Sequence, residues 1–219
     1  DILTAIARGK NTVTEIADFI GLSRENATTY LRTMDILDLI ERVTPITDPE
    51  AKRGLYKIRD PFFHFWFRFV RPNKRQLELG LERNTWEGIK EEFNAYLGHA
   101  FEDITLEILV EMAKKSQLPM KLEKIGRWWR KEVEIDLLGL ERKGDRAMAF
   151  EIKWAHIDHG EAKRLLYELE TKVHNIGNFE EHILGIIAKK IEDKHKIKNE
   201  GFLAMDLEDI KEVSRKSKT

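Results

Sequence analysis

The sequence contains no cysteine, which excludes disulfide bonds and metal sites built from thiolates. A chain without cysteine is typical of a reducing compartment, so we expect a cytoplasmic protein. Long apolar runs are absent as well: no stretch approaches the roughly 18–20 residues that a membrane-spanning helix requires, and we expect no membrane partner. Glutamine occurs only at Gln76 and Gln117, whereas Lys, Arg and Glu are abundant. That bias is typical of thermophile proteins.

A large excess of charge of one sign is also missing. The 219 residues carry a formal net charge of −1, so no global positive field attracts nucleic acid, and binding to DNA would depend on a local patch. Hydrophobic residues make up 42% of the chain and charged residues 35%, which argues against disorder and indicates a globular protein. The length suits one large domain or two small ones.

Residues 1–71 have the pattern of a winged helix-turn-helix domain. Apolar residues at helical spacing predict three short helices, with Gly21 ending the second and Ser23 placed to cap the third. The β-rich runs LIERVTP and GLYKIRD flank ITDPEAKR and predict a hairpin, the wing.

This domain offers polar side chains where such domains contact DNA. The third helix would face the major groove with its N-terminal part, and the wing tip would reach the neighbouring backbone. The candidate DNA-binding residues on these two surfaces are Arg24, Asn26, Thr28, Thr29, Arg32, Lys52 and Arg53. Arg and Asn read base edges, whereas Thr contacts phosphate or thymine methyl groups. We therefore expect DNA as a partner; the alternative is that the domain mediates protein contacts only.

The segment DPFFHFWFRFVRPNKR, residues 60–75, is the most aromatic part of the chain. Its rings cannot all face one side of a helix, and a segment that is apolar all round is expected to be buried between two domains. Stacking on bases is the alternative. Pro72 breaks the preceding helix, so we expect a helical linker over 72–97 and a second domain over 98–219, with a helix break near Gly98.

Strands alternate with helices over residues 98–219, which predicts an α/β domain with a mixed sheet covered on both faces. Within it, EVEIDLLGLERKGDRAMAFEIKW, residues 132–154, predicts a hairpin that carries charged residues inside its strands. Side chains alternate along a strand, so Glu151 and Lys153 share a face. On the partner strand Ile135 and Leu137 would share the apolar face, which places Asp136 beside Glu151 and Lys153.

This cluster predicts a metal site. Two nearby carboxylates resist ionising together unless a cation holds them, and Mg²⁺ takes one or two carboxylates and several waters. We expect Asp136 and Glu151 as metal ligands, Lys153 as the group that orients water or stabilises the transition state, and Glu102 as an auxiliary acid. These parts suit hydrolysis of a phosphodiester. The alternative is an ion pair on a solvated face of the sheet.

Asp136, then Glu151-Ile152-Lys153 on the next strand, after a helical Glu102, resembles the PD-(D/E)XK nuclease-like core. With YKIRDPFFHFWFRFVRPN, YLGHAFE, IGRWW and EIDLLGL…FEIKW, the chain resembles the C-terminal part of archaeal STAND-type, AAA-like ATPases of DUF234 type. The resemblance implies a winged helix followed by a restriction-endonuclease-like domain. Ile135 stands where the core pattern has Pro.

The resemblance also implies an upstream P-loop ATPase domain of the same polypeptide, and ATP would bind only there, because residues 1–219 contain no Walker motif. Three hypotheses follow: a DNA-binding, Mg²⁺-dependent nuclease; a non-catalytic docking or sensor module of an ATPase; and a winged-helix transcription regulator. The sequence leaves the substrate, the strand preference and the oligomeric state open.

Overall fold

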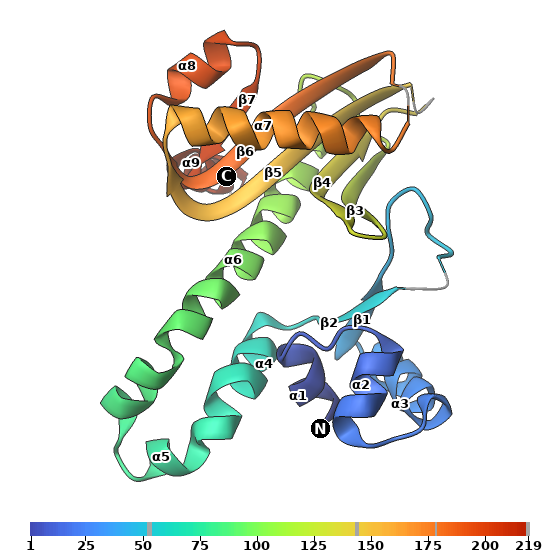
Figure 1. Ribbon diagram of the computed structural model, residues 1–219, viewed down its shortest axis with the longest axis vertical. Coiled ribbons are helices and arrows are strands. Elements are labelled where there is room, and N and C mark those ends of the chain that lie inside the picture. The colour runs from blue at the N-terminus through green and yellow to red at the C-terminus, as the bar shows by residue number, and fades with distance from the viewer. Residues whose placement is uncertain (52–53, 143–144, 178, 218–219) are drawn as a thin grey trace. The chain divides into compact units, whose positions relative to one another are not determined.

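The computed structural model describes residues 1–51, 54–142, 145–177 and 179–217 (Figure 1). The chain divides into two compact units. The first comprises Asp1–Thr44 and Asp48–Asn94, and the second comprises Pro45–Thr47 and Ala95–Thr219.

The first unit begins with three helices: α1 (Ile2–Ala7), α2 (Val13–Ile20) and α3 (Arg24–Ile36). Gly21 ends α2 with a φ of 70°, a left-handed conformation that glycine adopts without a steric penalty. Ser23 accepts the backbone N–H of Asn26 at 3.3 Å, which confirms the expected cap of α3. Gly21 and Ser23 thus supply the left-handed conformation and the helix cap that the short turn between α2 and α3 requires.

A small hairpin follows, formed by β1 (Ile40–Val43) and β2 (Leu55–Ile58), which pair antiparallel. Their buried side chains complete the core of this unit, whose members from the helices and strands include Ile6, Ile16, Leu31, Ile40 and Ile58. The predicted strands of the wing are thus present. Lys52 and Arg53, predicted at its tip, lie outside the described residues.

The aromatic segment forms α4 (Pro61–Phe65), a π-helical turn η1 (Trp66–Val70), a 3₁₀ turn η2 (Arg71–Asn73) and α5 (Lys74–Glu78). Phe69 is buried and its ring lies 5.6 Å from that of Phe65 and 5.7 Å from that of Phe93. Phe62 and Trp66 are exposed, Phe62 by 61%. The prediction that the whole segment is buried is wrong, because its rings point to all sides of the helical turns whereas the core covers only some of them.

Helix α6 (Glu82–Lys114) is continuous, so the predicted break near Gly98 is wrong. A glycine inside a helix costs only about 1 kcal/mol relative to alanine. Burial of Phe101 and Leu109 on the same helix exceeds that cost, since each large apolar side chain contributes about 1.5–3 kcal/mol. The predicted linker region, 72–97, contains η2, α5 and the first half of α6.

The second unit contains a five-stranded sheet with the order β3-β4-β5-β6-β7. The strands are β3 (Lys124–Arg130), β4 (Val133–Leu140), β5 (Arg146–Ile157), β6 (Glu181–Ile191) and β7 (Leu203–Asp206). β3, β4 and β5 pair antiparallel, whereas β5, β6 and β7 pair parallel. The sheet is therefore mixed, as predicted.

Helices cover both faces of this sheet, which also confirms the prediction. α7 (His159–His174) crosses one face and buries Leu166 and Leu169 in the same cluster as Ala149 (Figure 1). On the other face, Phe101 of α6 and Ile210 of α9 (Leu207–Ser217) pack in one cluster with strand residues. The short α8 (Lys194–Asn199) lies between β6 and β7 in the chain. No helix in the described part of the chain has both the length and the apolarity needed to cross a membrane.

Candidate active site

A β-bulge in β4 sets the direction of Asp136. Gly126 of β3 lies opposite Leu138, but Trp128 lies opposite Ile135, so β4 has one more residue than β3 over this stretch. Ile135 consequently packs in the α7-side cluster, whereas Leu137 packs in the α6-side cluster. The prediction that Ile135 and Leu137 share a face is wrong, because strict alternation does not hold across a bulge.

Strands β4 and β5 diverge immediately beside this bulge. Their ladder contains only residues 137–140 and 147–150, although β4 remains paired with β3 as far as Val133 and β5 with β6 as far as Ile157. The backbone N–H of Ile152 therefore lies beyond the β4–β5 ladder and has no backbone acceptor in β4. The carboxylate of Asp136 accepts it through Oδ2 at 2.7 Å. Asp136 thus lies where the two strands separate.

Glu151 lies next to this point and is held by two ammonium groups. Its side chain is only 7% exposed, and of the charged residues in the described part of the chain it is the one that is buried. Lys153 Nζ lies 2.7 Å from Oε1, and Lys172 Nζ of α7 donates to Oε2 at 2.9 Å. A buried carboxylate requires such partners, because desolvation of an unpaired charge costs several kcal/mol.

The electrostatics of the site follow from this crowding. Burial, and then the negative charge of Glu151, raise the pKa of Asp136 to about 6, against the opposing effects of the Ile152 N–H and Lys153. Burial lowers the pKa of Lys153. The hydrogen bond from Lys153 to Glu151 and the charges of the nearby carboxylates outweigh burial, so the pKa of Lys153 lies above its usual value. Lys153 is therefore an ammonium at neutral pH.

Glu102 flanks the site from α6. It is ion-paired with Arg127 of β3, whose guanidinium also lies 3.7 Å from Asp103. The hydrogen bond to Glu102 raises the pKa of His99, which precedes it by less than one helical turn. The charge of Glu102 also contributes to the raised pKa of Asp136. The structure thus brings the four predicted residues, Glu102, Asp136, Glu151 and Lys153, into one electrostatic cluster.

The cluster offers two carboxylates, Asp136 and Glu151, which are ligands of the kind that Mg²⁺ prefers. Oδ1 of Asp136 has no hydrogen-bond donor among the residues that the structure describes, and the repulsion between Asp136 and Glu151 would be relieved by a cation. Within the same residues there is no group of three or more His, Asp or Glu side chains that could hold a metal ion. Mg²⁺ suits a pair of carboxylates because it retains several waters instead of requiring a complete protein cage.

Sequence analysis did not assign two residues of the cluster, Lys172 and Arg127, to the site. The signal for Lys172 was present: it lies three residues after Leu169 and seven after Leu165, so it continues the apolar stripe of α7. A lysine on a buried stripe requires an anionic partner. Arg127 had no comparable signal, because its contact with Glu102 depends on the packing of α6 against the sheet.

Five of the predicted DNA-binding residues lie in the first unit, on α3. Arg24, Asn26, Thr29 and Arg32 are exposed, and Thr28 is half-buried. The hydroxyls of Thr28 and Thr29 donate to the carbonyls of Arg24 and Glu25 at 2.7 and 3.1 Å. These hydroxyl protons are therefore engaged with the helix, and the exposed cations of the surface are those of Arg24 and Arg32.

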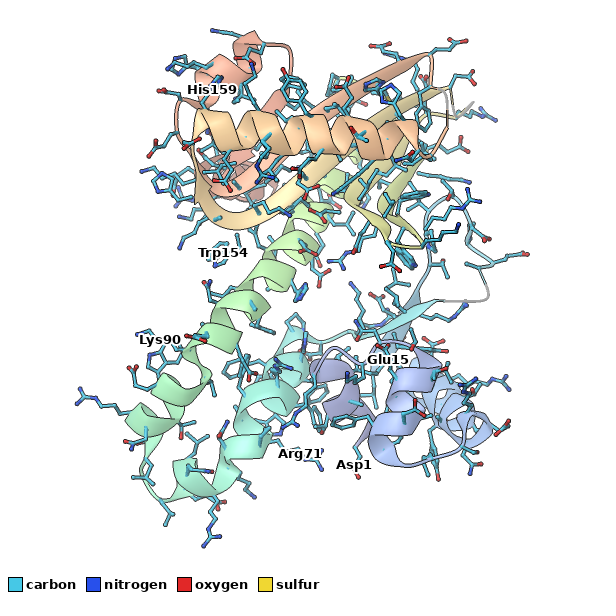
Figure 2. The ribbon with its side chains drawn as sticks, in the orientation of Figure 1. Asp1, Glu15, Arg71, Lys90, Trp154 and His159 are labelled. Carbon is cyan, nitrogen blue, oxygen red and sulfur yellow. The ribbon has the colours of Figure 1, made fainter. Side chains whose placement is uncertain are left out.

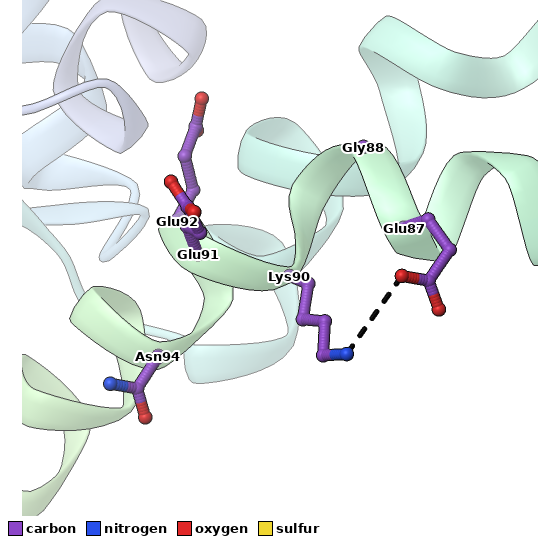
Figure 3. Close-up of a pocket in the computed structure, with 6 residues that line it drawn as sticks. All are labelled: Glu87, Gly88, Lys90, Glu91, Glu92 and Asn94. Atoms are coloured by element: carbon purple, nitrogen blue, oxygen red, sulfur yellow. Dashed lines mark ion pairs between the residues drawn. The ribbon is translucent and has the colours of Figure 1, made fainter.

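A hollow of about 800 Å³ beside α6 contains none of the predicted site residues. Figure 3 shows its lining from a single helix, Glu87, Gly88, Lys90, Glu91, Glu92 and Asn94. Lys90 lies 3.8 Å from Glu87, a spacing typical of an exposed ion pair on a helix. The hollow has the character of a solvated helical face.

We predict that Asp136→Asn stabilises the protein at neutral pH. In the folded state the pKa of Asp136 is raised from 3.8 to about 6, so the native protein binds the proton more tightly and loses stability as pH rises through this window. Asparagine is neutral and still accepts the Ile152 N–H. Urea unfolding at about pH 7.5 should show a gain of about 1–3 kcal/mol that shrinks toward zero near pH 4.

Glu134→Gln is the matched control, because Glu134 is exposed on the same strand. Its effect should stay within about 0.5 kcal/mol at both pH values. A loss of stability in Asp136→Asn at neutral pH, or the same gain at both pH values, would contradict the electrostatic description of the site.

Known structures align with this chain at low identity. A repair endonuclease from Pyrococcus abyssi aligns with a TM-score of 0.30 and 14% identity, over 46% of each chain. Protein VC1899 from Vibrio cholerae aligns with a TM-score of 0.41 and 10% identity, over 96% of this chain and 47% of that one.

Sequence comparison gives stronger matches. The chain is 38% identical over 212 residues to MJECL04, an uncharacterized protein of Methanocaldococcus jannaschii. This alignment covers 95% of the chain but 47% of the relative, so the chain spans about half the length of that protein. A family model also matches part of the chain. Residues 66–165, which include Glu102, Asp136, Glu151 and Lys153, match the DUF234 family of archaeal and bacterial proteins of unknown function.

Proposed function

We propose that the second unit hydrolyses phosphodiester bonds with the help of a divalent metal ion and that the first unit binds DNA through α3. The observation that carries this proposal is the pairing of two carboxylates, Asp136 and Glu151, at the point where β4 and β5 diverge, with Lys153 Nζ 2.7 Å from Glu151. Acids held together in this way and a fixed ammonium are the parts that metal-assisted attack on a phosphate requires.

Each residue has a role that follows from its position. Asp136 and Glu151 would hold Mg²⁺, which when bound acidifies water and steadies negative charge on a phosphate. The ammonium of Lys153 is fixed by Glu151 and is 38% exposed, so it can orient the attacking water or stabilise the charge of the transition state. Glu102, fixed by Arg127, would orient water at the edge of the site.

Cleavage of plasmid DNA tests the proposed activity. Wild type is expected to nick DNA with Mg²⁺ and not with EDTA, whereas Asp136→Ala and Lys153→Ala should each lose at least about 100-fold in rate. Activity should also fall as pH is lowered, because protonation of Asp136 removes a metal ligand. Bound Mg²⁺ favours the ionised carboxylate, so the midpoint should lie below the metal-free pKa of about 6. Glu134→Ala, on the exposed part of the same strand, serves as the control and should cleave like wild type. Equal activity in all the variants would reject the assigned site.

Duplex binding tests the proposed role of α3. Arg24→Ala and Arg32→Ala should each weaken binding of the whole protein to duplex DNA, by roughly tenfold if the arginine contacts a base edge. Lys10→Ala, an exposed lysine before α2, is the control in the same unit. Unchanged affinity in both arginine variants would remove DNA binding from α3. Sequence-selective binding without cleavage would instead favour the transcription regulator.

A non-catalytic docking or sensor module is the second candidate, and the ion pairs of Glu151 favour it. Both carboxylate oxygens of Glu151 already have ammonium partners, Lys153 and Lys172, so the cluster is also consistent with a structural role. Calorimetry with Mg²⁺ or Mn²⁺ separates the two candidates, because a docking module has no need of a divalent ion.

A further inference from the structure

We propose that Lys172 of α7 is a positioning residue of the candidate metal site, which holds Glu151 by Oε2 and thereby directs Oε1 toward the ion. This inference rests on the proposed function and separates the tasks of the two ammonium groups that bind Glu151. Lys153 Nζ lies 2.7 Å from Oε1, and Lys172 Nζ donates to Oε2 at 2.9 Å. The two oxygens of one carboxylate therefore have partners from different elements, β5 and α7.

The ion would bind Glu151 on the Oε1 side. Asp136, the other expected ligand, accepts the N–H of Ile152, which lies between Glu151 and Lys153 on β5. Lys153, which pairs with Oε1, is also the lysine whose charge acts on Asp136. A cation that relieves the repulsion between two carboxylates lies close to both. Oε1 is therefore the oxygen that an ion shared with Asp136 would contact, and Oε2 is left to Lys172.

Lys172 reaches Glu151 from the α7 face of the sheet. Helix α7 begins at His159, which is labelled in Figure 2, and crosses this face (Figure 1). Its buried stripe includes Leu169, and Lys172 continues the stripe three residues later. Ala149, two residues before Glu151 on β5, packs in the same cluster as Leu169, so Glu151 points toward α7. The packing of α7 on the sheet thus fixes the direction from which Lys172 holds the carboxylate.

A hydrogen bond of this kind is what a metal-binding carboxylate requires. Glu151 is only 7% exposed, and a buried carboxylate needs a cationic partner whether or not a metal ion is bound. Carboxylate ligands are oriented by hydrogen bonds from groups that do not contact the metal, and loss of such a bond typically lowers metal affinity roughly 10–100-fold. Lys172 can supply this bond in both states, because the oxygen that it contacts is not the one directed toward Asp136.

Calorimetric titration of the whole chain with Mg²⁺ tests this role. Methionine keeps the unbranched stem of lysine without its charge. Lys172→Met should weaken Mg²⁺ binding by roughly 10–100-fold, because Glu151 loses the bond that orients it. Lys153→Met should instead strengthen binding by up to about fivefold, because it removes a positive charge beside the ion. Lys172→Arg keeps the charge and the donors and should bind Mg²⁺ like wild type. If the charge near Glu151 alone mattered, both methionine variants would bind more tightly.

The ¹⁵N resonances of the lysine ammonium groups test the same role in the wild type, without a substitution that could affect folding. Hydrogen-bonded ammonium groups keep their hydrogens longer than groups that are free in water. On addition of Mg²⁺ we expect the signal of Lys153 to change most, since its partner oxygen is the one that the ion contacts. The signal of Lys172 should persist, because its bond to Oε2 is retained.

Lys163→Met is the matched control. Lys163 is on the same helix, nine residues before Lys172 or about 13 Å along the axis, and pairs with Glu200 at 3.0 Å. Its loss should leave Mg²⁺ affinity unchanged.

Unchanged or tighter Mg²⁺ binding in Lys172→Met would overturn the role of Lys172 alone, as would loss of its ammonium signal when Mg²⁺ is added. Failure of the wild type to bind Mg²⁺ would reject this role together with the metal site. Mg²⁺ binding that depends on Lys172, in a protein that does not cleave DNA, would reject the nuclease function and retain the positioning role.

Discussion

The divergence of β4 and β5 is the constraint on which the candidate site depends. Once the strands separate after Leu137 and Phe150, the N–H of Ile152 needs an acceptor that the ladder no longer supplies. Asp136 provides one, and to do so its carboxylate must lie inside the protein next to Glu151. Burial and the charge of Glu151 then raise the pKa of Asp136 to about 6. The unusual charge state of the site is thus a consequence of an interruption in the sheet.

The surrounding fold offsets the cost of this arrangement. Apolar clusters on both faces of the sheet surround the point of divergence, and Lys153 and Lys172 compensate the buried charge of Glu151 from β5 and α7. Keeping two acids close together lowers the stability of the folded state, and a local loss of stability of this kind is typical of functional sites.

Much of this organisation could be predicted from the sequence because it depends on local patterns. Helical spacing and the cap at Ser23 predicted α3, and the alternation in FEIKW predicted that Glu151 and Lys153 share a face. The bulge at Asp136 could not be predicted, since it is defined only by the register with β3. Lys172 reaches Glu151 across 21 positions of sequence, a contact that requires α7 to be packed on the sheet. The continuity of α6 through Gly98 likewise depends on tertiary packing that overrides a local preference.

The most direct test is the pKa of the Asp136 carboxyl, followed by carbon NMR in the whole chain with and without Mg²⁺. A pKa of about 6 is predicted for the metal-free protein, and it should fall when Mg²⁺ is added, because a cation favours the ionised form. A pKa near 3.8 without metal would show that Asp136 is neither buried nor crowded by Glu151. A raised pKa that does not respond to Mg²⁺ would contradict the metal site and leave the cluster as a structural ion network.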